Sequence, residues 1–165
     1  MDAQGRRPAR QRKHRLPREA YTGEIVVAFT ACVARQISPF TDASLVDTFK
    51  CFLSRASHTH GCRVLGYCFM PDHVHVALQG TRPSSDLRKA MSLFKQLSGY
   101  WLARNRPEVR WQRGFYDHVL RREEDILVHL RYIAENPVRR GLVDDWRDYG
   151  FTGSDVFDLR DVLAS

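Results

Sequence analysis

The chain has 165 residues, the size of a single domain, and 43% of them are hydrophobic, which is enough for a packed core and excludes a wholly disordered protein. Lys and Arg outnumber Asp and Glu by 26 to 19, and the resulting net charge of +7 favours a polyanionic partner, most often nucleic acid. No apolar run approaches the roughly 18 residues that span a bilayer, so we expect no membrane partner.

The first 18 residues form a basic, proline-containing arm whose arginines include Arg10, Arg12 and Arg15. Such a segment cannot bury apolar surface, so we expect it to be disordered in the free protein. A phosphate-binding arm and an inert, solvated tail are both compatible with this charge. The arm lacks the apolar stretch of a signal peptide, and the four cysteines show no C-x-x-C spacing. We therefore expect reduced thiols in a cytoplasmic, nucleoid-associated protein.

Hydrophobic patterning predicts one folded domain over residues 19–150 and a C-terminal tail over 151–165. Strands are predicted at 24–35, 62–70 and 73–78, and a further strand or extended segment at 111–120. Helices are predicted at 43–57, with Thr41 or Asp42 as the cap, from Ser84 or Ser85 to about 104, and from about 123 to 136, before Pro137. This β-α-β-β-α-β order with an extra helix indicates the α+β class and a ferredoxin-like, RRM-like split βαβ fold. In that fold helices cover one face of a central antiparallel sheet.

The strand predicted at 73–78 carries two histidines, His73 and His75, in the run FMPDHVHVAL. Side chains alternate along a strand, so both imidazoles lie on one face, while Val74 and Val76 point to the opposite face, which we expect to be the core. Two imidazoles side by side can bind one divalent cation such as Mn or Zn, and also Mg when oxygen ligands complete the shell. The spacing alone is a weak signal, because structural and solvated histidines are at least as common.

The helix predicted at about 123 to 136 has two stripes of side chains. The apolar stripe consists of Ile126, Leu127, Leu130, Ile133 and Ala134. The polar stripe, roughly 130° away, consists of Asp125, His129, Tyr132 and Asn136. A tyrosine beside a cation-bound phosphate can attack phosphorus and form a phosphotyrosine ester. Asn136 lies four residues beyond Tyr132 and can offer a carbonyl oxygen as a third ligand.

Other residues offer alternatives to these assignments. Tyr132 could be an ordinary half-buried helix tyrosine. Tyr116, in the alternating segment WQRGFYDHVLR, is expected to pack on the sheet as a structural residue. His58, His60 and Cys62 lie close together in a predicted loop before the second strand. They could bind zinc, so a zinc hydrolase is an alternative function for the chain.

Three motifs resemble a known family. The run GYCFMPDHVHVAL over residues 66–78 looks like the HUH strand of insertion-sequence-type single-tyrosine transposases. The runs WQRGFYDHVLR over 111–121 and YIAENPVRRGLV over 132–143 resemble the branch called REP-associated tyrosine transposases. The similarity runs from about residue 24 to 146, and three motifs in the right order make it far more specific than the histidine pair alone.

The resemblance implies a DNA-nicking enzyme with Mg or Mn as cofactor. His73 and His75 match the metal-binding histidines, Tyr132 matches the nucleophile, and Asn136 matches an amide that completes the metal shell. In this family the tyrosine attacks single-stranded DNA and leaves a 5′-phosphotyrosine link and a free 3′-hydroxyl. The substrates are palindromic, hairpin-forming elements, and the branch is described as monomeric, which favours a monomer over a dimer here.

Basic residues are expected to hold the phosphates of such a substrate. They are Arg10, Arg12, Arg15, Arg88, Lys89, Lys95, Arg121, Arg122, Arg139 and Arg140. For each of them taken singly, a solvated surface role is the alternative. For the whole chain, the alternative is a non-catalytic binder of structured nucleic acid on the same fold, which needs neither the histidine pair nor the tyrosine.

Overall fold

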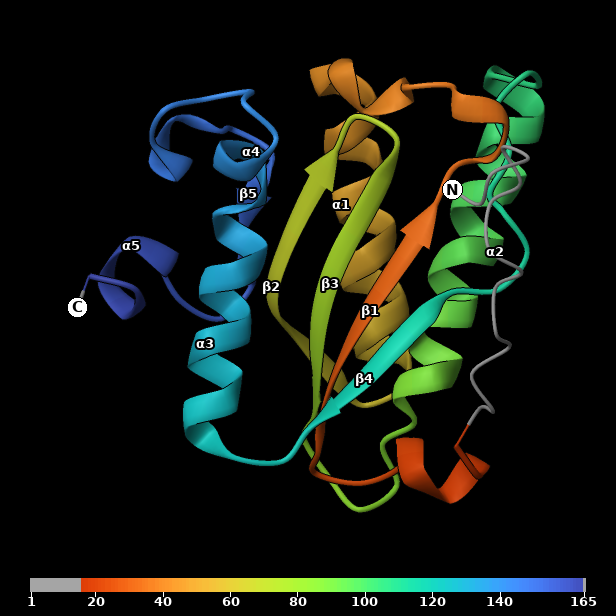
Figure 1. Cartoon of the computed structure of the whole chain (residues 1–165). Helices are drawn as coiled ribbons and strands as arrows, with labels where there is room; N and C mark the ends of the chain where they lie inside the picture. The colour runs from red at the N-terminus through yellow and green to blue at the C-terminus, as the bar shows by residue number, and fades with distance from the viewer. Residues whose placement is uncertain (1–15, 165) are drawn as a thin grey trace, which may run out of the picture.

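The computed structural model describes residues 16–164 (Figure 1), so the predictions for Arg10, Arg12 and Arg15 fall outside the described residues. The strands are β1 (Val26–Cys32), β2 (Cys62–Met70), β3 (His73–Gly80), β4 (Tyr116–Leu120) and β5 (Thr152–Gly153). The helices are α1 (Ala43–Thr59), α2 (Leu87–Asn105), α3 (Glu123–Ala134), α4 (Asn136–Arg139) and α5 (Leu159–Val162). Short 3-10 helices lie at Arg18–Tyr21, Ala34–Gln36, Pro39–Thr41 and Trp146–Asp148. In this part of the chain no helix combines the length and the apolar character needed to cross a bilayer.

The strands form one antiparallel sheet in the order β4-β1-β3-β2-β5. This confirms the predicted α+β fold with its central antiparallel sheet. The segment predicted at 111–120 is a strand only in its last five residues, because only these pair with β1. The two-residue strand β5 was not predicted, since so short a segment has no periodicity of its own.

One face of the sheet is the main core, and α1 and α2 cover it (Figure 1). Val74 and Val76 of β3 are fully buried there, as the alternation predicted. The carboxylate of Asp42 caps α1 by accepting from the backbone N–H groups of Ser44 and Leu45, which confirms one of the two predicted caps.

The start of α2 differs slightly from the prediction. Asp86, rather than Ser84 or Ser85, caps the helix by accepting from the backbone N–H of Lys89. Ser85 is buried, and its hydroxyl donates to the carbonyl oxygen of Gly61, so it fastens the loops at that end of the sheet.

The opposite face of the sheet, which carries the histidines, is covered in part by α3. Leu130, Ile133 and Ala134 of α3 are buried in a second apolar cluster against this face. Leu127, expected in the same stripe, is 42% exposed because it lies at the edge of the stripe, beyond the contact with the sheet. The apolar stripe therefore packs α3 on the face of the sheet that carries the histidines, for which no covering element was predicted.

The helix predicted to continue to residue 136 breaks at Glu135. The ring of Pro137 would clash with the carbonyl of Ile133, and its nitrogen has no hydrogen to donate to that carbonyl. Proline suits the first turn of a helix, so α4 begins at Asn136 with Pro137 in its first turn. Tyr132 and Asn136 therefore belong to two successive helices rather than to one continuous face.

Candidate active site

His73 and His75 form a close pair on β3. Their Nε2 atoms are 3.2 Å apart, and their rings are perpendicular, with centroids 4.8 Å apart. The outer nitrogen of each ring has its own partner. Nδ1 of His73 lies 2.7 Å from a carboxylate oxygen of Asp72, and Nδ1 of His75 lies 2.9 Å from the hydroxyl of Thr30 on β1.

These outer partners determine which ring nitrogens face each other. A carboxylate only accepts hydrogen bonds, so His73 donates from Nδ1, and in the neutral ring Nε2 carries the lone pair. His75 presents the same tautomer when its Nδ1–H donates to Thr30. Burial, and secondarily the charges of His73, His129, Arg139 and Arg140, lower the pKa of His75 to about 3. A neutral imidazole with a free Nε2 lone pair is the form that binds metal ions.

The histidine pair fits a single divalent cation. Two nitrogen ligands in adjacent positions of one coordination shell, each about 2.1 Å from the ion, are about 3 Å apart, close to the separation of the Nε2 atoms here. Within residues 16–164 no group of three or more His, Cys, Asp or Glu side chains is arranged to hold a metal ion. The remaining ligands would therefore be oxygens of an amide, of water or of a bound phosphate.

Asn136 is the amide best suited to this role. It is one of four buried polar residues in the described chain and is only 6% exposed. A side-chain amide carries a carbonyl oxygen, which is a ligand that Mg and Mn accept. It begins α4, which contacts β2, the strand next to the histidines in the sheet.

Tyr132 of α3 is 52% exposed, so its side chain is accessible to a large substrate. Its ring centroid is 5.8 Å from that of His129, and the ring of His129 is 6.3 Å from that of His118 on β4. On the other side, the guanidinium of Arg139 lies 3.9 Å from the centroid of the Tyr132 ring. His129 and Arg139, the two groups that contact the Tyr132 ring, both contribute to the lowered pKa of His75.

A second exposed tyrosine lies on the face of the sheet that carries the histidines. Tyr116 of β4 lies opposite Thr30, and Thr30 lies opposite His75, so the three side chains share the histidine face. Tyr116 is 46% exposed, which corrects the prediction that it packs on the sheet as a structural residue. The reason is that β4 is the edge strand and α3 contacts mainly β2, leaving this end of the face uncovered.

The other predicted cluster, His58, His60 and Cys62, does not form a metal site. His58 lies in the last turn of α1 rather than in a loop, and His60 follows the helix end. The Cys62 thiol is buried and donates to the carbonyl of His60, and burial raises its pKa to about 11. A protonated, buried thiol is a poor zinc ligand, so the structure offers no support for a zinc hydrolase.

The predicted phosphate-binding residues are not gathered at one place. Arg88, Lys89 and Lys95 belong to α2, on the face of the sheet away from the histidines. The Lys95 ammonium donates to the backbone carbonyls of Gln112 and Gly114 and thereby fastens the segment before β4. This corrects the prediction for Lys95, whose amine is used within the chain.

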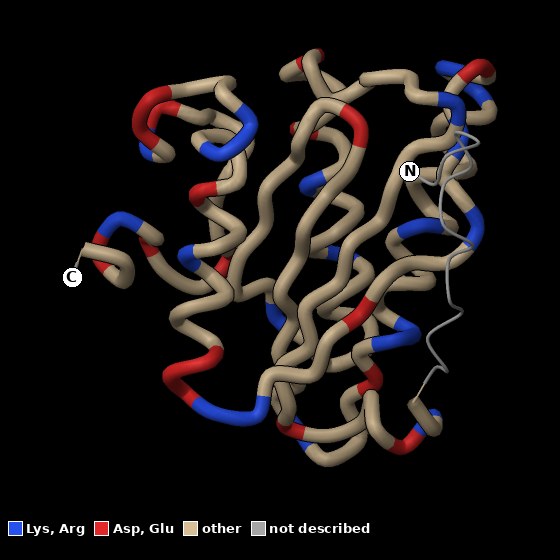
Figure 2. Tube along the Cα trace, viewed as in Figure 1, with Lys and Arg blue, Asp and Glu red and all other residues tan. Residues whose placement is uncertain are grey.

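The remaining four arginines lie at the two ends of α3. Arg121 and Arg122 are exposed where β4 leads into α3, and Arg139 and Arg140 are exposed at the end of α4. Figure 2 shows basic segments at both of these ends. The two later arginines are near enough to lower the pKa of His75, so they are the basic pair associated with the candidate site.

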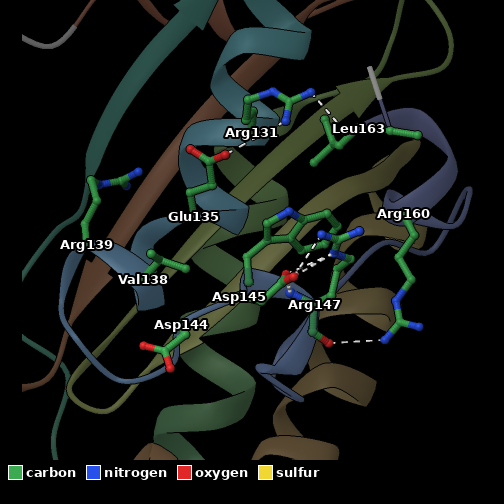
Figure 3. A pocket seen from close by; sticks show the side chains of 11 residues that line it. Arg131, Glu135, Val138, Arg139, Asp144, Asp145, Arg147, Arg160 and Leu163 are labelled. Carbon is green, nitrogen blue, oxygen red and sulfur yellow. Dashed lines mark hydrogen bonds and ion pairs between the residues drawn. The ribbon is translucent and has the colours of Figure 1, made fainter.

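A cavity of about 490 Å³ lies between α3, α4 and the C-terminal segment (Figure 3). Its charged side chains largely satisfy one another: Arg147 pairs with Asp145 at 2.8 Å, and Arg131 lies 3.8 Å from Glu135. Arg131 also donates to the carbonyl of Leu163 at 2.9 Å. These contacts attach the C-terminal segment to α3, which is a structural role.

Sequence reasoning missed Thr30, Asp72, His118 and His129 as parts of the site. Asp72 could have been found, since a carboxylate directly before His73 can reach its Nδ1. Thr30 could not, because its contact with His75 depends on the pairing of strands 45 residues apart. Nothing in the sequence pointed to His118, and His129 was noted only as a member of the polar stripe.

Comparisons with known proteins agree with the family that the sequence motifs resemble. The family model described as "Transposase IS200 like" matches residues 24–136. A curated protein of Haemophilus influenzae, named as a REP-associated tyrosine transposase, is 25% identical over 120 residues, which are 65% of this chain and 67% of that protein.

Two solved structures share the fold. A REP-associated tyrosine transposase bound to a REP hairpin superposes with a TM-score of 0.73 at 19% identity, covering 86% of this chain and 82% of that one. A Deinococcus radiodurans protein described as a transposase gives a TM-score of 0.51 at 16% identity over 68% of this chain and 91% of that one.

Proposed function

The chain belongs to the family of IS200-like transposases, and from that membership we propose that it nicks and rejoins single-stranded, hairpin-forming DNA through a 5′-phosphotyrosine intermediate. Membership agrees with the resemblance noted in the sequence. The observation that carries the proposal is that α3, the helix of Tyr132, packs through Leu130 and Ile133 on the sheet face that bears the two histidines. His129 and Arg139, whose side chains contact the Tyr132 ring, also contribute to the lowered pKa of His75. A protein that only binds DNA needs no such conjunction.

The histidine pair would hold the cofactor. The Nε2 atoms of His73 and His75 are 3.2 Å apart, and the outer nitrogens of the two rings contact Asp72 and Thr30. Asn136 is the third protein ligand in this proposal, because it is nearly buried and begins α4, which contacts β2, the neighbour of the histidine strand. A bound Mg or Mn ion would polarise the scissile phosphate and offset charge in the transition state.

Tyr132 supplies the nucleophile. Its phenolic oxygen forms a bond to phosphorus while the bond from phosphorus to the 3′ oxygen breaks. The phenol gives up its proton, and the departing 3′ oxygen gains one and becomes a hydroxyl. The phosphate stays attached to the 5′ side of the break and to Tyr132. In the second step a 3′-hydroxyl loses its proton and attacks phosphorus, the bond from phosphorus to the Tyr132 oxygen breaks, and the phenol regains a proton. A phosphodiester is restored, so one difficult exchange becomes two easier transfers.

A hairpin of single-stranded DNA is the proposed substrate. The hairpin-bound REP-associated transposase shares this fold over most of both chains, and the net charge of this chain is +7. Arg121, Arg122 and Arg140 are exposed on the flanks of α3, where they can contact phosphates. The arm with Arg10, Arg12 and Arg15 would add sequence-independent affinity. Chromosomal DNA as substrate would place the protein at the nucleoid, in the cytoplasm.

The proposed enzyme acts as a monomer. This part of the proposal is supported by Leu130, Ile133 and Ala134, which pack α3 against the sheet of the same chain, so that the proposed nucleophile and histidines would come from one molecule. A site that is complete within one chain does not need a partner to supply the tyrosine.

The experiment combines labelled single-stranded hairpins with protein and either Mg or Mn, and seeks a shifted band that protease removes. The wild type should form this covalent band, whereas Tyr132→Phe should not. Tyr100→Phe is the matched control, since Tyr100 is 66% exposed on α2, on the other side of the sheet. His73→Ala combined with His75→Ala should abolish cleavage and leave hairpin binding largely intact. A covalent band from Tyr132→Phe contradicts the proposal, and binding without any covalent product in the wild type would indicate the non-catalytic binder.

A further inference from the structure

We propose that Arg139 is a positioning residue that holds the side chain of Tyr132 in the orientation needed for attack on DNA. The proposal rests on the function proposed above and adds to it how the nucleophile is oriented. Tyr132 is half exposed on a helix surface, so packing against the core cannot fix its ring. Another contact has to do so if the phenol is to meet phosphorus in line.

Arg139 makes two direct contacts with Tyr132. Its guanidinium carbon lies 3.9 Å from the centroid of the phenol ring, and its Nη2 donates to the backbone carbonyl of Tyr132 at 2.6 Å. The hydrogen bond anchors the flat guanidinium, and the anchored plane then covers one side of the ring. One residue therefore constrains both the backbone and the side chain of the nucleophile.

The break between α3 and α4 makes these contacts possible. The last four carbonyl groups of a helix lack partners within the helix, and Tyr132 is among the last four residues of α3. A cation at this end is favoured both as a hydrogen-bond donor and by the helix dipole. Pro137 ends α3, and the short helix α4 that follows brings Arg139 back to the open carbonyl.

Arg139 also lies on an element that packs beside the histidine strand. It ends α4, which contacts β2, and β2 is the neighbour of β3 in the sheet. The guanidinium that stacks on Tyr132 therefore belongs to a segment held against this part of the sheet. This geometry gives Arg139 a role distinct from the general phosphate contact expected from the sequence.

A second arginine–tyrosine stack in the chain provides a matched control. Arg104 of α2 lies 5.4 Å from the ring centroid of Tyr100 and donates to its hydroxyl at 2.8 Å. This pair is exposed and lies on a helix that packs on the other face of the sheet. Arg104→Gln removes the same kind of contact without touching α3.

The first measurement needs no DNA and no metal. Protein labelled with 3-fluorotyrosine gives one fluorine resonance for each of its six tyrosines, and Tyr132→Phe and Tyr100→Phe identify the two of interest. Arg139→Gln should shift the Tyr132 resonance and leave that of Tyr100 in place, and Arg104→Gln should do the reverse. An unmoved Tyr132 resonance in Arg139→Gln overturns the proposal.

The second measurement follows the rate of covalent adduct formation at saturating hairpin DNA in Mn, together with the Kd for the hairpin. Arg139→Gln should slow adduct formation by about 10²-fold, the usual cost of a nucleophile misplaced by about 1 Å, while the Kd changes by less than about twofold. Arg139→Lys keeps the charge but not the flat guanidinium, so it should restore little of the rate. Arg104→Gln should match the wild type.

Three outcomes overturn the positioning role. A weakened Kd with an unchanged saturated rate would make Arg139 a phosphate contact. Full rescue by Arg139→Lys would make its charge sufficient. If Arg139→Gln lowers both the rate and the melting temperature, and Arg139→Lys restores both, then Arg139 is simply a cap of α3. Failure of the proposed function would look different. In that case the wild type would form no covalent adduct, or Tyr132→Phe would still form one.

Discussion

Replacing Thr30 with valine tests whether the tautomer of His75 matters for binding the cation. The Thr30 hydroxyl lies 2.9 Å from Nδ1 of His75, on the neighbouring strand and on the same face. Valine keeps the branched shape and the preference for a strand but removes the acceptor. His75 then has no fixed partner for its outer N–H, so both its tautomer and its ring orientation are released.

The expected magnitude follows from the burial of His75. A buried donor left without an acceptor costs about 1–3 kcal/mol. Outer partners of metal-binding histidines typically contribute about 10–100-fold to metal affinity, which corresponds to about 1.4–2.7 kcal/mol. We therefore expect Thr30→Val to raise the Kd for Mn by about 10–100-fold.

The assay is a titration of the protein with Mn, with free Mn measured by electron paramagnetic resonance. Thr152→Val is the matched control. Thr152 lies in the same row of the sheet, and its hydroxyl contacts the thiol of Cys68 rather than a histidine. This variant should bind Mn like the wild type, and Thr30→Ser should recover most of the affinity. If folded Thr30→Val binds Mn as tightly as the wild type, the orientation argument for His75 is wrong.

Three further predictions concern stability. Burial lowers the pKa of His75 from 6.5 to about 3, so the folded state binds this proton less well than the unfolded chain and stability falls as the pH drops below about 6.5. Between pH 7 and pH 5 this group alone should reduce the free energy of unfolding of the metal-free protein by about 2 kcal/mol. In urea denaturation of His75→Gln, the free energy of unfolding should lose that part of its pH dependence. The same pH dependence as in the wild type would contradict this prediction. A Cβ on Gly66 would lie 2.7 Å from a methyl group of Leu130, whose side chain is buried, so Gly66→Ala should force that side chain to move and cost about 1 kcal/mol in thermal unfolding. A wild-type melting temperature would show that Leu130 repacks without cost. The Tyr149 hydroxyl donates to the carbonyl of Phe69 at 2.6 Å, so Tyr149→Phe should cost about 1 kcal/mol in urea denaturation, and no loss would show that this contact does not hold the C-terminal segment on β2.

Local periodicity was enough to predict β1, β2 and β3 and the face of the histidines. His73 and His75 share a face because alternation along β3 requires it, and the register of β3 against its neighbours agrees. The apolar stripe of α3 was also visible, and Leu130 and Ile133 are buried as expected. The patterning could not show which face of the sheet would receive that stripe, because both faces of β2 are apolar.

The contacts that complete the site depend on long-range pairing or on a break in regular structure. Thr30 meets His75 only through the register of β1 and β3. Arg139 meets Tyr132 only because the chain turns at Glu135, and a continuous helix would have left the Tyr132 carbonyl bonded within it. Tyr116 was misjudged because alternation does not tell an edge strand from a covered one.

The central claim is that the oxygen of Tyr132 bonds covalently to DNA, and peptide mapping of the adduct tests it most directly. Wild-type protein is incubated with a single-stranded hairpin and Mn, digested with nuclease and protease, and analysed by mass spectrometry. The account predicts a nucleotide phosphate on the peptide that contains Tyr132, with the mass located on that residue. A nucleotide on the peptide that contains Tyr116 instead, or on any other residue, would contradict the account.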